Sequence, residues 1–462
     1  MSQFKVIIVG GGPTGLTAGH CLGKAGIDFE ILEARADLDF PGGTTIAIWS
    51  QNVRVLDQLG LMDEAYSMCA PIMDKLNILP DGSELARNNL PSLTGILLVR
   101  SSRDYIFSAN RRADRFGHEW INVSRPELIS LLRRRLPGGE ARIYKNKRVV
   151  SVERHKEGIS VRCADGSLHH GSMVIGSDGV HSVLRDIVTK EVPAGAKTAK
   201  NSKTEMTATF GALFGSADRQ PSSSGVTDVP EGTFFETHGK DAMMQSAVMN
   251  GLVYFAIYGR LAEPAQERRR FSDADKMHFM SRWADSHFAP GVKVKDLVAR
   301  AKWTNMVHLE EGVMDVPWYG DRVVLVGDSV HKMTPNLGLA YNQAMQGAVT
   351  LTNVLRRLLL ESPAPSTQEL RDHVFAPYQA GNMKNAIKAN DISGISLRMG
   401  SWCNPLATWL DKYLMPRING DETAIKLLVA PLILDGVVLD FVAEKAFKTG
   451  KKKWKHPGIT GK

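Results

Sequence analysis

Short, largely apolar runs recur along this chain, and several of them lead into a glycine. Runs of this kind are typical of strands that are covered on both faces, as in a parallel sheet. The predicted strands of this type are residues 4–9, 29–32, 173–176 and 323–326. Between the first two, apolar residues at Leu16, Ala18 and Leu22 predict a helix. The pattern therefore predicts a strand–helix–strand unit at the start of an α/β domain.

A glycine-rich turn, GGGPTG, follows the first predicted strand. Gly10, Gly12 and Gly15 form a G-x-G-x-x-G pattern, and Glu33 follows the second strand, 18 residues after the last glycine. In a dinucleotide site these glycines make the tight turn, let a pyrophosphate approach, and let helix and strand pack closely. The helix N-terminus offers free N–H groups to the phosphates, and the acid accepts hydrogen bonds from the ribose. The complete unit predicts a dinucleotide site, whereas the glycines alone would fit an ordinary turn.

The middle of the chain follows a different pattern. Residues 206–215 and 251–259 alternate or run apolar, which predicts strands of a second sheet. We expect this sheet to hold the substrate, lined by Tyr254, Tyr258 and Phe235, although core packing accounts for each of these residues as well. The polar stretch at 217–230 predicts a loop that could act as a lid.

The last part of the chain is predicted to be helical. Asn404 and Pro405 have the residue types of an N-cap and a first helical residue. Apolar residues then share one helical face: Leu406, Trp409, Leu410, Tyr413 and Leu414. Residues 427–434 are apolar but contain a proline, which argues against a membrane span. Two interpretations remain open: a membrane-surface contact with the lysine-rich end near anionic lipid, or a helical cap followed by a disordered tail.

Composition and charge exclude some classes of protein. The chain has 462 residues, 43% hydrophobic and 23% charged, as is ordinary for a globular enzyme of two or three domains. Seven lysines and one glutamate at 443–462 supply +6 of the net charge of +8. The rest of the chain is therefore close to neutral and has no basic stripe of the kind that binds nucleic acid. Four scattered cysteines without C-x-x-C argue against disulfides or a metal site and suit a reducing compartment. A strand pattern at the start argues against a signal peptide.

Two further glycine–aspartate motifs complete a recognisable set. Asp178-Gly179 follows the run at 173–176, and Gly327-Asp328 follows the run at 323–326. With the G-x-G-x-x-G pattern, they resemble the signature of single-component FAD-dependent monooxygenases with the para-hydroxybenzoate hydroxylase fold. The stretches LDQLG, SDGVHSVLR and GDSVHKMTPNLG are most similar to the fungal meroterpenoid and indole-diterpene (paxilline-type) epoxidase branch. The resemblance implies an α/β fold: an FAD-binding Rossmann-like domain of the glutathione-reductase type, an inserted β-sheet substrate domain and a C-terminal helical region.

The resemblance also implies an activity. NADPH or NADH would bind transiently and reduce the bound FAD, and O2 would then form a flavin C4a-hydroperoxide that delivers one oxygen atom. In this branch the acceptor is typically a prenyl-chain alkene, which becomes an epoxide. The alternatives are an aromatic hydroxylase with the same cofactor chemistry and a flavin dehydrogenase or reductase without oxygen insertion. A flavin halogenase is disfavoured because the sequence has no W-x-W element. A non-catalytic FAD-binding module is disfavoured because all three cofactor motifs are present.

Residues of the FAD site follow from the same resemblance. Asp328 would bind the ribityl chain, Pro335 would lie beside the isoalloxazine, and a helix beginning near Gly338 would point its N-terminus at the ring. Arg125 would reach the phosphate or ribityl region, and Asp178 would serve the same cofactor. The remaining implied cofactor contacts are Arg35, Gly43, Arg54 and Ala340. His331 and Pro335 are the candidate catalytic residues, although a hydrogen-bonded loop histidine accounts for His331 equally well.

One stretch departs from the family pattern. Most relatives have Gly-Gln-Gly-x-Asn after the proline, whereas this chain has Gly-Leu-Ala-Tyr-Asn at 338–342, and Gln346 replaces an acid. Ala340 adds a methyl group where bare backbone normally faces the flavin, and alanine avoids positive φ. We therefore expect either a rearranged flavin edge or weakened oxygen chemistry.

The predicted domain organisation has three parts. Residues 1–75, 100–190 and 300–395 would form the FAD-binding domain, 76–99 and 191–299 the substrate domain, and 396–462 the C-terminal helical region. The predicted partners are a prenylated small molecule and O2, without nucleic acid. Residues 400–462 would contact a membrane peripherally or monotopically, inside the cell at the endoplasmic reticulum face.

Overall fold

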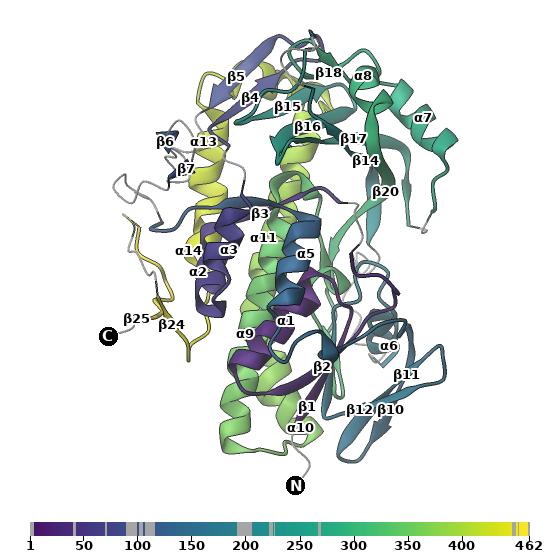
Figure 1. Cartoon of the computed structure of the whole chain (residues 1–462), viewed down its shortest axis with the longest axis vertical. Coiled ribbons are helices and arrows are strands. Elements are labelled where there is room, and N and C mark those ends of the chain that lie inside the picture. Colours follow the sequence, from purple (N-terminus) through teal and green to yellow (C-terminus); the bar gives the residue numbers. More distant parts are fainter. Residues whose placement is uncertain are drawn as a thin grey trace.

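Two large sheets lie towards opposite ends of the molecule, joined by two long helices, α9 (Leu339–Glu361) and α11 (Ala376–Gly400) (Figure 1). The computed structural model describes residues 4–39, 43–69, 72–88, 99–100, 105–106, 116–191, 206–220, 225, 227–266, 269–445, 450 and 452–460. The α/β fold class expected from the sequence is confirmed.

The first sheet has six strands, and all four predicted apolar runs form part of it. Its order is β21-β22-β13-β1-β2-β9, parallel except for β21. The strands are β1 (Lys5–Val9), β2 (Asp28–Leu32), β9 (Ile143–Tyr144), β13 (Met173–Gly176), β21 (Tyr319–Gly320) and β22 (Val323–Leu325). Apolar side chains on α1 (Pro13–Lys24) and α9 complete the core around this sheet, as expected for strands covered on both faces.

The second sheet has eight strands in the order β23-β20-β14-β17-β16-β15-β4-β5. They are β4 (Asp74–Ile78), β5 (Glu84–Asn88), β14 (Thr207–Asp218), β15 (Thr233–Gly239), β16 (Ala242–Met249), β17 (Leu252–Ala265), β20 (Ala301–Val313) and β23 (His331–Lys332). The strands predicted at 206–215 and 251–259 are therefore confirmed. One face packs on α7 (Asp273–Ser281) and α8 (Val294–Ala299).

The predicted domain boundaries stay a prediction. Three strands of the eight-stranded sheet, β4, β20 and β23, begin within the ranges predicted for the FAD-binding domain. Residues 301–313, which we assigned to the FAD-binding part, form β20 of the eight-stranded sheet. The predicted loop at 217–230 begins after β14 ends at Asp218, and 221–224 and 226 lie outside the described residues.

The other strands form smaller sheets and pairs outside the two large sheets. The strands are β3 (Thr45–Ile48), β6 (Val99–Arg100), β7 (Tyr105–Ile106), β8 (Ile121–Ser124), β10 (Val149–His155), β11 (Gly158–Cys163), β12 (Leu168–Gly171), β18 (His287–Ala289) and β19 (Val292–Lys293). The helices are α2 (Ser50–Leu59), α3 (Met62–Ser67), α5 (Arg125–Arg134), α6 (Val183–Glu191) and α10 (Thr367–Leu370). The Ser124 side chain caps α5 by accepting from the Glu127 backbone N–H.

The C-terminal part forms short helical turns beside α11 and the eight-stranded sheet (Figure 1). They are α12 (Pro405–Trp409), η7 (Leu410–Leu414), α13 (Gly420–Ala424), η8 (Ile425–Val429) and α14 (Ala430–Leu434), followed by β24 (Ala443–Glu444) and β25 (Ile459–Thr460). The predicted cap is confirmed, because the Asn404 side chain accepts from the Ala407 N–H at 2.8 Å. Within the described part of the chain, no helix combines the length and apolar character needed to cross a bilayer.

Candidate functional site

Three glycine motifs meet at the carboxyl edge of the six-stranded sheet. Val9 of β1 lies in register with Gly176 of β13, which lies in register with Leu325 of β22. The turns that carry Gly10, Asp178 and Asp328 therefore leave the sheet side by side. Ligands of open α/β sheets bind at this edge.

The first turn leaves open space for a ligand at one glycine and none at the other two. A Cβ at Gly10, where φ is +108°, would lie 2.3 Å from the Ser177 carbonyl oxygen, and one at Gly15 would lie 1.9 Å from the Gly10 carbonyl oxygen. A Cβ at Gly12 would have no atom within 4 Å. Gly12 precedes α1, whose first turn has no side-chain cap. This geometry fits a pyrophosphate at the helix N-terminus.

Polar groups continue along the same edge. Glu33 accepts from the backbone N–H groups of Gly11 and Arg35, both at 2.8 Å. Burial raises the pKa of Asp178, and its Oδ1 is buried without a hydrogen-bond partner among the described residues. An unpaired buried oxygen of this kind is costly and fits a ligand that donates to it.

Arg125 stands near this edge at the start of α5. Its backbone N–H donates to the Thr44 carbonyl, and Gly43 lies against its side chain. Burial and the charge of Arg35 lower the pKa of Arg125, whereas the charge of Asp328 raises it. Arg35, Arg125 and Asp328 are therefore close enough to interact. Asp328 also forms an ion pair with Lys332 at 2.6 Å. The structure thus gathers these predicted residues, and their contact with FAD stays a prediction.

The turn before α9 answers one part of the concern about Ala340, the strain of its backbone; the effect of its methyl group on the flavin stays a prediction. Gly338 takes the left-handed conformation, with φ +62°, and a Cβ there would lie 2.9 Å from the Ala47 Cβ. Ala340 lies in the first turn of α9 with ordinary helical geometry and packs against apolar neighbours. The backbone requirement for positive φ therefore falls on the glycine that the chain has kept, and Ala340 imposes no strained conformation.

Asn342 and Gln346 fix this turn to its surroundings. Asn342 donates to the carbonyls of Ala47 and Gly338, both at 2.7 Å, and accepts from the Trp49 N–H at 2.8 Å. Gln346, which replaces an acid of the family pattern, accepts from the Val437 N–H at 2.6 Å. Gln346 therefore joins α9 to the C-terminal segment. Its amide oxygen accepts this backbone N–H without burying a charge, which a carboxylate at this position would do.

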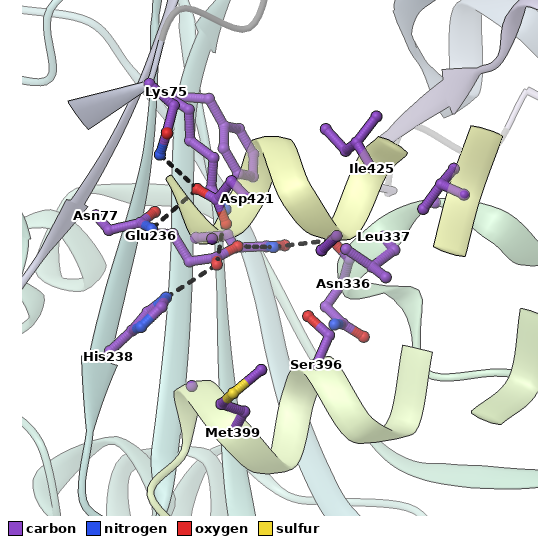
Figure 2. Close-up of a pocket in the computed structure, with 18 of the residues that line it drawn as sticks. Lys75, Asn77, Glu236, His238, Asn336, Leu337, Ser396, Met399, Asp421 and Ile425 are labelled. Atoms are coloured by element: carbon purple, nitrogen blue, oxygen red, sulfur yellow. Dashed lines mark hydrogen bonds and ion pairs between the residues drawn. The ribbon is translucent and has the colours of Figure 1, made fainter. Parts of the chain in front are cut away.

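A cavity of about 360 Å³ begins at this turn. Its walls come from β3, the turn at Pro335–Leu337, strands β4 and β15, and helices α11 to η8 (Figure 2). Apolar residues of the wall include Trp49, Ile72, Trp120, Phe234, Ile392 and Ile425. The rings of Trp49 and Trp120 stack with centroids 6.0 Å apart. A cavity of this size and lining suits a largely apolar small molecule.

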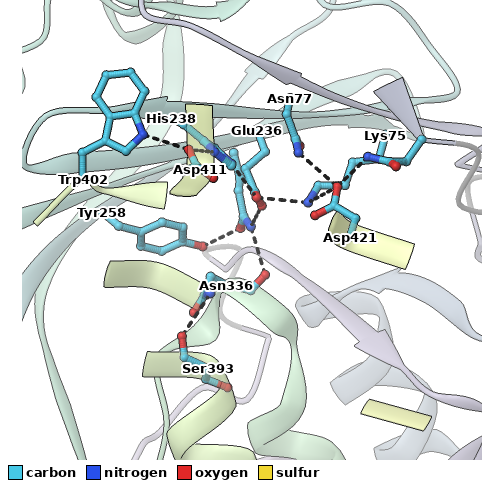
Figure 3. Close-up of polar contacts among 12 residues, drawn as sticks. Lys75, Asn77, Glu236, His238, Tyr258, Asn336, Ser393, Trp402, Asp411 and Asp421 are labelled. Atoms are coloured by element: carbon cyan, nitrogen blue, oxygen red, sulfur yellow. Dashed lines mark hydrogen bonds and ion pairs between the residues drawn. The ribbon is translucent and has the colours of Figure 1, made fainter. Parts of the chain in front are cut away.

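Five ionisable side chains form a connected cluster on the cavity wall (Figure 3). His238 donates to Asp411 at 2.8 Å and to Glu236 at 2.9 Å. Lys75 contacts Glu236 at 3.0 Å and Asp421 at 3.1 Å. We call Lys75, Glu236, His238, Asp411 and Asp421 the cavity cluster. Gln245 joins it to the turn before α9 by donating to Glu236 at 2.8 Å and to the Asn336 carbonyl at 2.9 Å.

Two members of the cavity cluster, His238 and Glu236, have strongly shifted pKa values. Burial lowers the pKa of His238, but the charges and hydrogen bonds of Asp411 and Glu236 outweigh burial and raise that pKa to about 10. Burial raises the pKa of Glu236, but Lys75 and His238 outweigh it and hold that pKa far below the usual range. His238 and Glu236 are therefore both charged near pH 7 and do not exchange protons there.

Some predicted residues lie elsewhere. Tyr258 and Pro335 line the cavity, but Phe235 faces the core on the other side of β15, because alternate strand residues point to opposite faces. Tyr254 hydrogen-bonds to Ser124, outside the cavity lining. His331 is buried against Trp318, also outside the lining, and burial lowers its pKa to about 4. His331 is therefore buried and neutral at pH 7, and a catalytic role for it stays a prediction.

Arg54 is a further correction. Its guanidinium forms a fully buried ion pair with Glu444, at 3.0 Å and 2.7 Å, and lies over the Trp454 ring at 4.4 Å. It therefore holds the C-terminal segment rather than facing the cofactor edge. Trp454 is 6% exposed, so it is not part of a membrane-facing surface.

The sequence reasoning missed the whole cavity cluster. A signal was present, because Lys75 and Asn77, like Glu236 and His238, are polar residues two positions apart on apolar strands. Such spacing puts both side chains on one face.

Comparison with known proteins identifies the family. A family model described as an FAD binding domain matches residues 3–367. The FAD-dependent monooxygenase srdH of Neurospora crassa is 32% identical over 466 residues, which covers 98% of each chain. The chain belongs to the FAD-dependent monooxygenases. The monooxygenase ausM of Penicillium brasilianum is 30% identical over 423 residues, covering 90% of this chain and 83% of that protein.

Solved structures agree with this fold. HpxO of Klebsiella pneumoniae in complex with FAD and uric acid matches 94% of this monooxygenase and 97% of its own chain, with a TM-score of 0.69 and 22% identity. A salicylate hydroxylase substrate complex covers 94% of this chain and 98% of its own, with a TM-score of 0.64 and 18% identity. At these identities the likeness establishes the fold.

Proposed function

We propose that this monooxygenase epoxidises an alkene of a prenyl chain carried by a polar head group, as in meroterpenoid or indole-diterpene intermediates. The observation that carries the proposal is the cavity, in which a long apolar wall and a charged cluster share one space beside the turn before α9. An aromatic acid or a small ring would leave the apolar wall at Ile72, Ile392 and Ile425 uncovered. A prenyl chain would cover it and bury apolar surface at about 25 cal/mol per Å².

FAD, when bound, supplies the oxygen chemistry, with NADPH or NADH as a transient electron donor and O2 as the oxygen source. The chain's own residues bind and orient. The Gly12 turn and the first turn of α1 would hold the pyrophosphate, and Asp178, Asp328 and Arg125 the neighbouring part of the cofactor. Gly338 and the open first turn of α9 would present backbone N–H groups to negative charge. Trp49 and Trp120 would exclude water from the reacting alkene.

Oxygen labelling tests the reaction. The holoenzyme is incubated with NADPH, ¹⁸O2 and a panel of farnesylated phenols, pyrones and indoles, and products are analysed by mass spectrometry and NMR. We expect one labelled oxygen per product and the loss of one alkene. A labelled ring hydroxyl would favour the aromatic hydroxylase instead. Substrate oxidation without label would replace the monooxygenase proposal for these compounds by dehydrogenation. Parallel assays with NADH identify the donor.

We also propose contact with a membrane surface inside the cell, at the endoplasmic reticulum face. Support comes from exposed apolar side chains on the C-terminal helices, where Leu406 and Leu427 are each 66% exposed and Trp409 is 54% exposed. Interfacial helices bind lipid through such side chains. Several lysines of the tail lie outside the described residues.

Vesicle flotation tests this contact. We expect the protein to float with vesicles that contain phosphatidylserine, and the double variant Leu406→Glu/Trp409→Glu to remain in solution. The matched control is Leu360→Glu, because Leu360 on α9 is equally exposed at 68%. Equal flotation of all three proteins would contradict the proposed surface.

A further inference from the structure

The acids of the cavity cluster come from two parts of the chain. Glu236 lies on β15, whereas Asp411 and Asp421 lie on the C-terminal helices. The FAD binding domain family model ends at residue 367, so Asp411 and Asp421 belong to a segment outside it. The C-terminal helices therefore contribute charged groups to the cavity as well as covering it (Figures 2 and 3).

The charges of the cavity cluster do not balance. Lys75 and protonated His238 supply two positive charges, and Glu236, Asp411 and Asp421 supply three negative charges, which leaves a net charge of −1. Arg87, which also lines the cavity and carries a charge, pairs with Glu84 at the exposed edge. A net negative charge in a largely apolar cavity favours a ligand that donates hydrogen bonds.

Among the three carboxylates, Asp421 is the most exposed. Its side chain is 22% exposed, against 7% for Glu236 and 6% for Asp411. Both oxygens of Glu236 accept hydrogen bonds within the cluster.

The two oxygens of Asp421 differ. Oδ2 accepts from Asn77 at 3.0 Å and Asn88 at 2.7 Å and contacts Lys75. Oδ1 has no hydrogen-bond partner among the described residues and is not fully buried, and Asp421 is one of the residues that line the cavity. The three contacts to Oδ2 hold the carboxylate in place, so Oδ1 is a fixed acceptor, and a fixed acceptor costs little ordering entropy when a ligand binds.

We propose that Asp421 anchors the head group of the substrate by accepting a hydrogen bond from its hydroxyl or N–H group at Oδ1. The proposal rests on the proposed function, because it assumes a prenylated substrate in this cavity. The anchor fixes one end of the molecule, so the distance from Asp421 to the turn before α9 selects which alkene of the chain is oxidised. Asp421 is thus a specificity residue supplied by the C-terminal helices.

Binding to the oxidised holoenzyme tests the anchor without turnover. The probes are 2-farnesylphenol and its methyl ether, which differ in the donor proton, and binding is followed by the change in flavin absorbance. The variant is Asp421→Asn, whose amide oxygen retains an acceptor for Asn77 and Asn88. The matched control is Glu422→Gln, which removes one charge from the same helix outside the cavity lining.

We expect Asp421→Asn to weaken binding of the phenol about tenfold, equivalent to about 1.4 kcal/mol, because a hydrogen bond to a charged acceptor becomes one to a neutral acceptor. Binding of the methyl ether should change less than twofold, which also shows that the cavity remains folded. Oxygenation of the phenol by the variant should spread over more than one alkene. The control should resemble the wild type in each respect.

Three outcomes overturn the anchor: equal weakening for both probes, no weakening for either, or no binding of either to the wild type. The proposed function is judged separately by labelled oxygen in the product. Equal binding of the phenol and the methyl ether by the wild type, with labelled oxygen in the product, would overturn the anchor alone. Preferential binding of the phenol by the wild type and its loss in Asp421→Asn, without oxygen incorporation, would overturn the proposed function alone.

Discussion

Replacing Arg54 by methionine tests how the C-terminal segment is held. The side chains of Arg54 and Glu444 have no exposed area, and two hydrogen bonds at 3.0 Å and 2.7 Å join them. Arg54 also donates to the His456 carbonyl at 3.2 Å and lies over the Trp454 ring. Methionine preserves much of the apolar volume but leaves the Glu444 carboxylate buried without its cation.

The expected cost follows from two limits. Breaking a buried ion pair by removing one partner typically costs about 3–5 kcal/mol. The carboxylate can instead take up a proton, and protonating an ordinary glutamate at pH 7 costs about 3.7 kcal/mol. We therefore expect the free energy of unfolding to fall by about 3–4 kcal/mol at pH 7. The loss should shrink by about 1.4 kcal/mol per pH unit, to about 1 kcal/mol at pH 5, because proton uptake becomes easier.

Urea denaturation at pH 5, 6 and 7 measures this loss of stability. Trypsin cleavage at the C-terminal lysines measures whether the C-terminal segment has detached. Glu444→Gln should cost less than Arg54→Met at pH 7, because the arginine keeps the His456 carbonyl and the Trp454 ring. The double variant Arg54→Met/Glu444→Leu should recover most of the stability, since an apolar pair replaces an ionic one. The reasoning would be refuted if Arg54→Met had the same free energy of unfolding as the wild type at pH 7, or if its loss of stability did not change with pH.

Three further predictions concern the cofactor turn, the turn before α9 and the cavity cluster. Gly12→Val should weaken FAD binding in a fluorescence titration and have little effect on the unfolding of the apoprotein. Gly15→Ala should destabilise the apoprotein, because its Cβ would lie 1.9 Å from a carbonyl oxygen. A destabilised Gly12→Val apoprotein together with a stable Gly15→Ala apoprotein would contradict this assignment. Gly338→Ala should cost about 1–2 kcal/mol in urea unfolding, because φ is +62°; an unchanged midpoint would count against strain there. Since the pKa of His238 is raised to about 10, its contribution to stability is complete below its ordinary value of about 6.5 and is lost as pH rises towards 10. His238→Gln should therefore show a shallower fall in thermal stability between pH 7 and 10, and an unchanged slope would exclude the assignment.

The cofactor half of the site could be predicted from the sequence because its signals are local. Each glycine motif directly follows an apolar run, and parallel strands bring their carboxyl ends to one edge. The strands at 173–176 and 323–326 were predicted separately, and the register of Val9, Gly176 and Leu325 then aligned their turns. The left-handed turn was harder to assign, because the sequence did not show that Gly338 rather than residue 340 takes positive φ.

The cavity cluster could not be predicted in the same way, because its parts are distant in sequence. β4 and β15 pair in parallel, with Phe234 opposite Lys75 and Glu236 opposite Asn77. The alternation on each strand is visible in the sequence, but this pairing spans about 160 residues and depends on the whole sheet. Asp411 and Asp421 then approach from the C-terminal helices. The residues after these helices pair with the buried Arg54, which motif position had assigned to the cofactor.

The Arg54 ion pair and the proposed anchor belong to one continuous segment, which leads to a test of both. Lys455, next to Trp454, donates its backbone N–H to the Leu434 carbonyl at 3.0 Å and pairs with Asp435 at 2.8 Å, at the end of α14. We therefore expect the ion pair to help hold the end of α14 and, through it, the preceding helices that carry Asp421. Arg54→Met should weaken phenol binding relative to the methyl ether at pH 7, although no cavity residue has changed. At pH 5, where the buried carboxyl can be neutral, discrimination should largely return. Full discrimination at pH 7, together with a detached C-terminal segment by proteolysis, would mean that Asp421 is held by the substrate sheet alone.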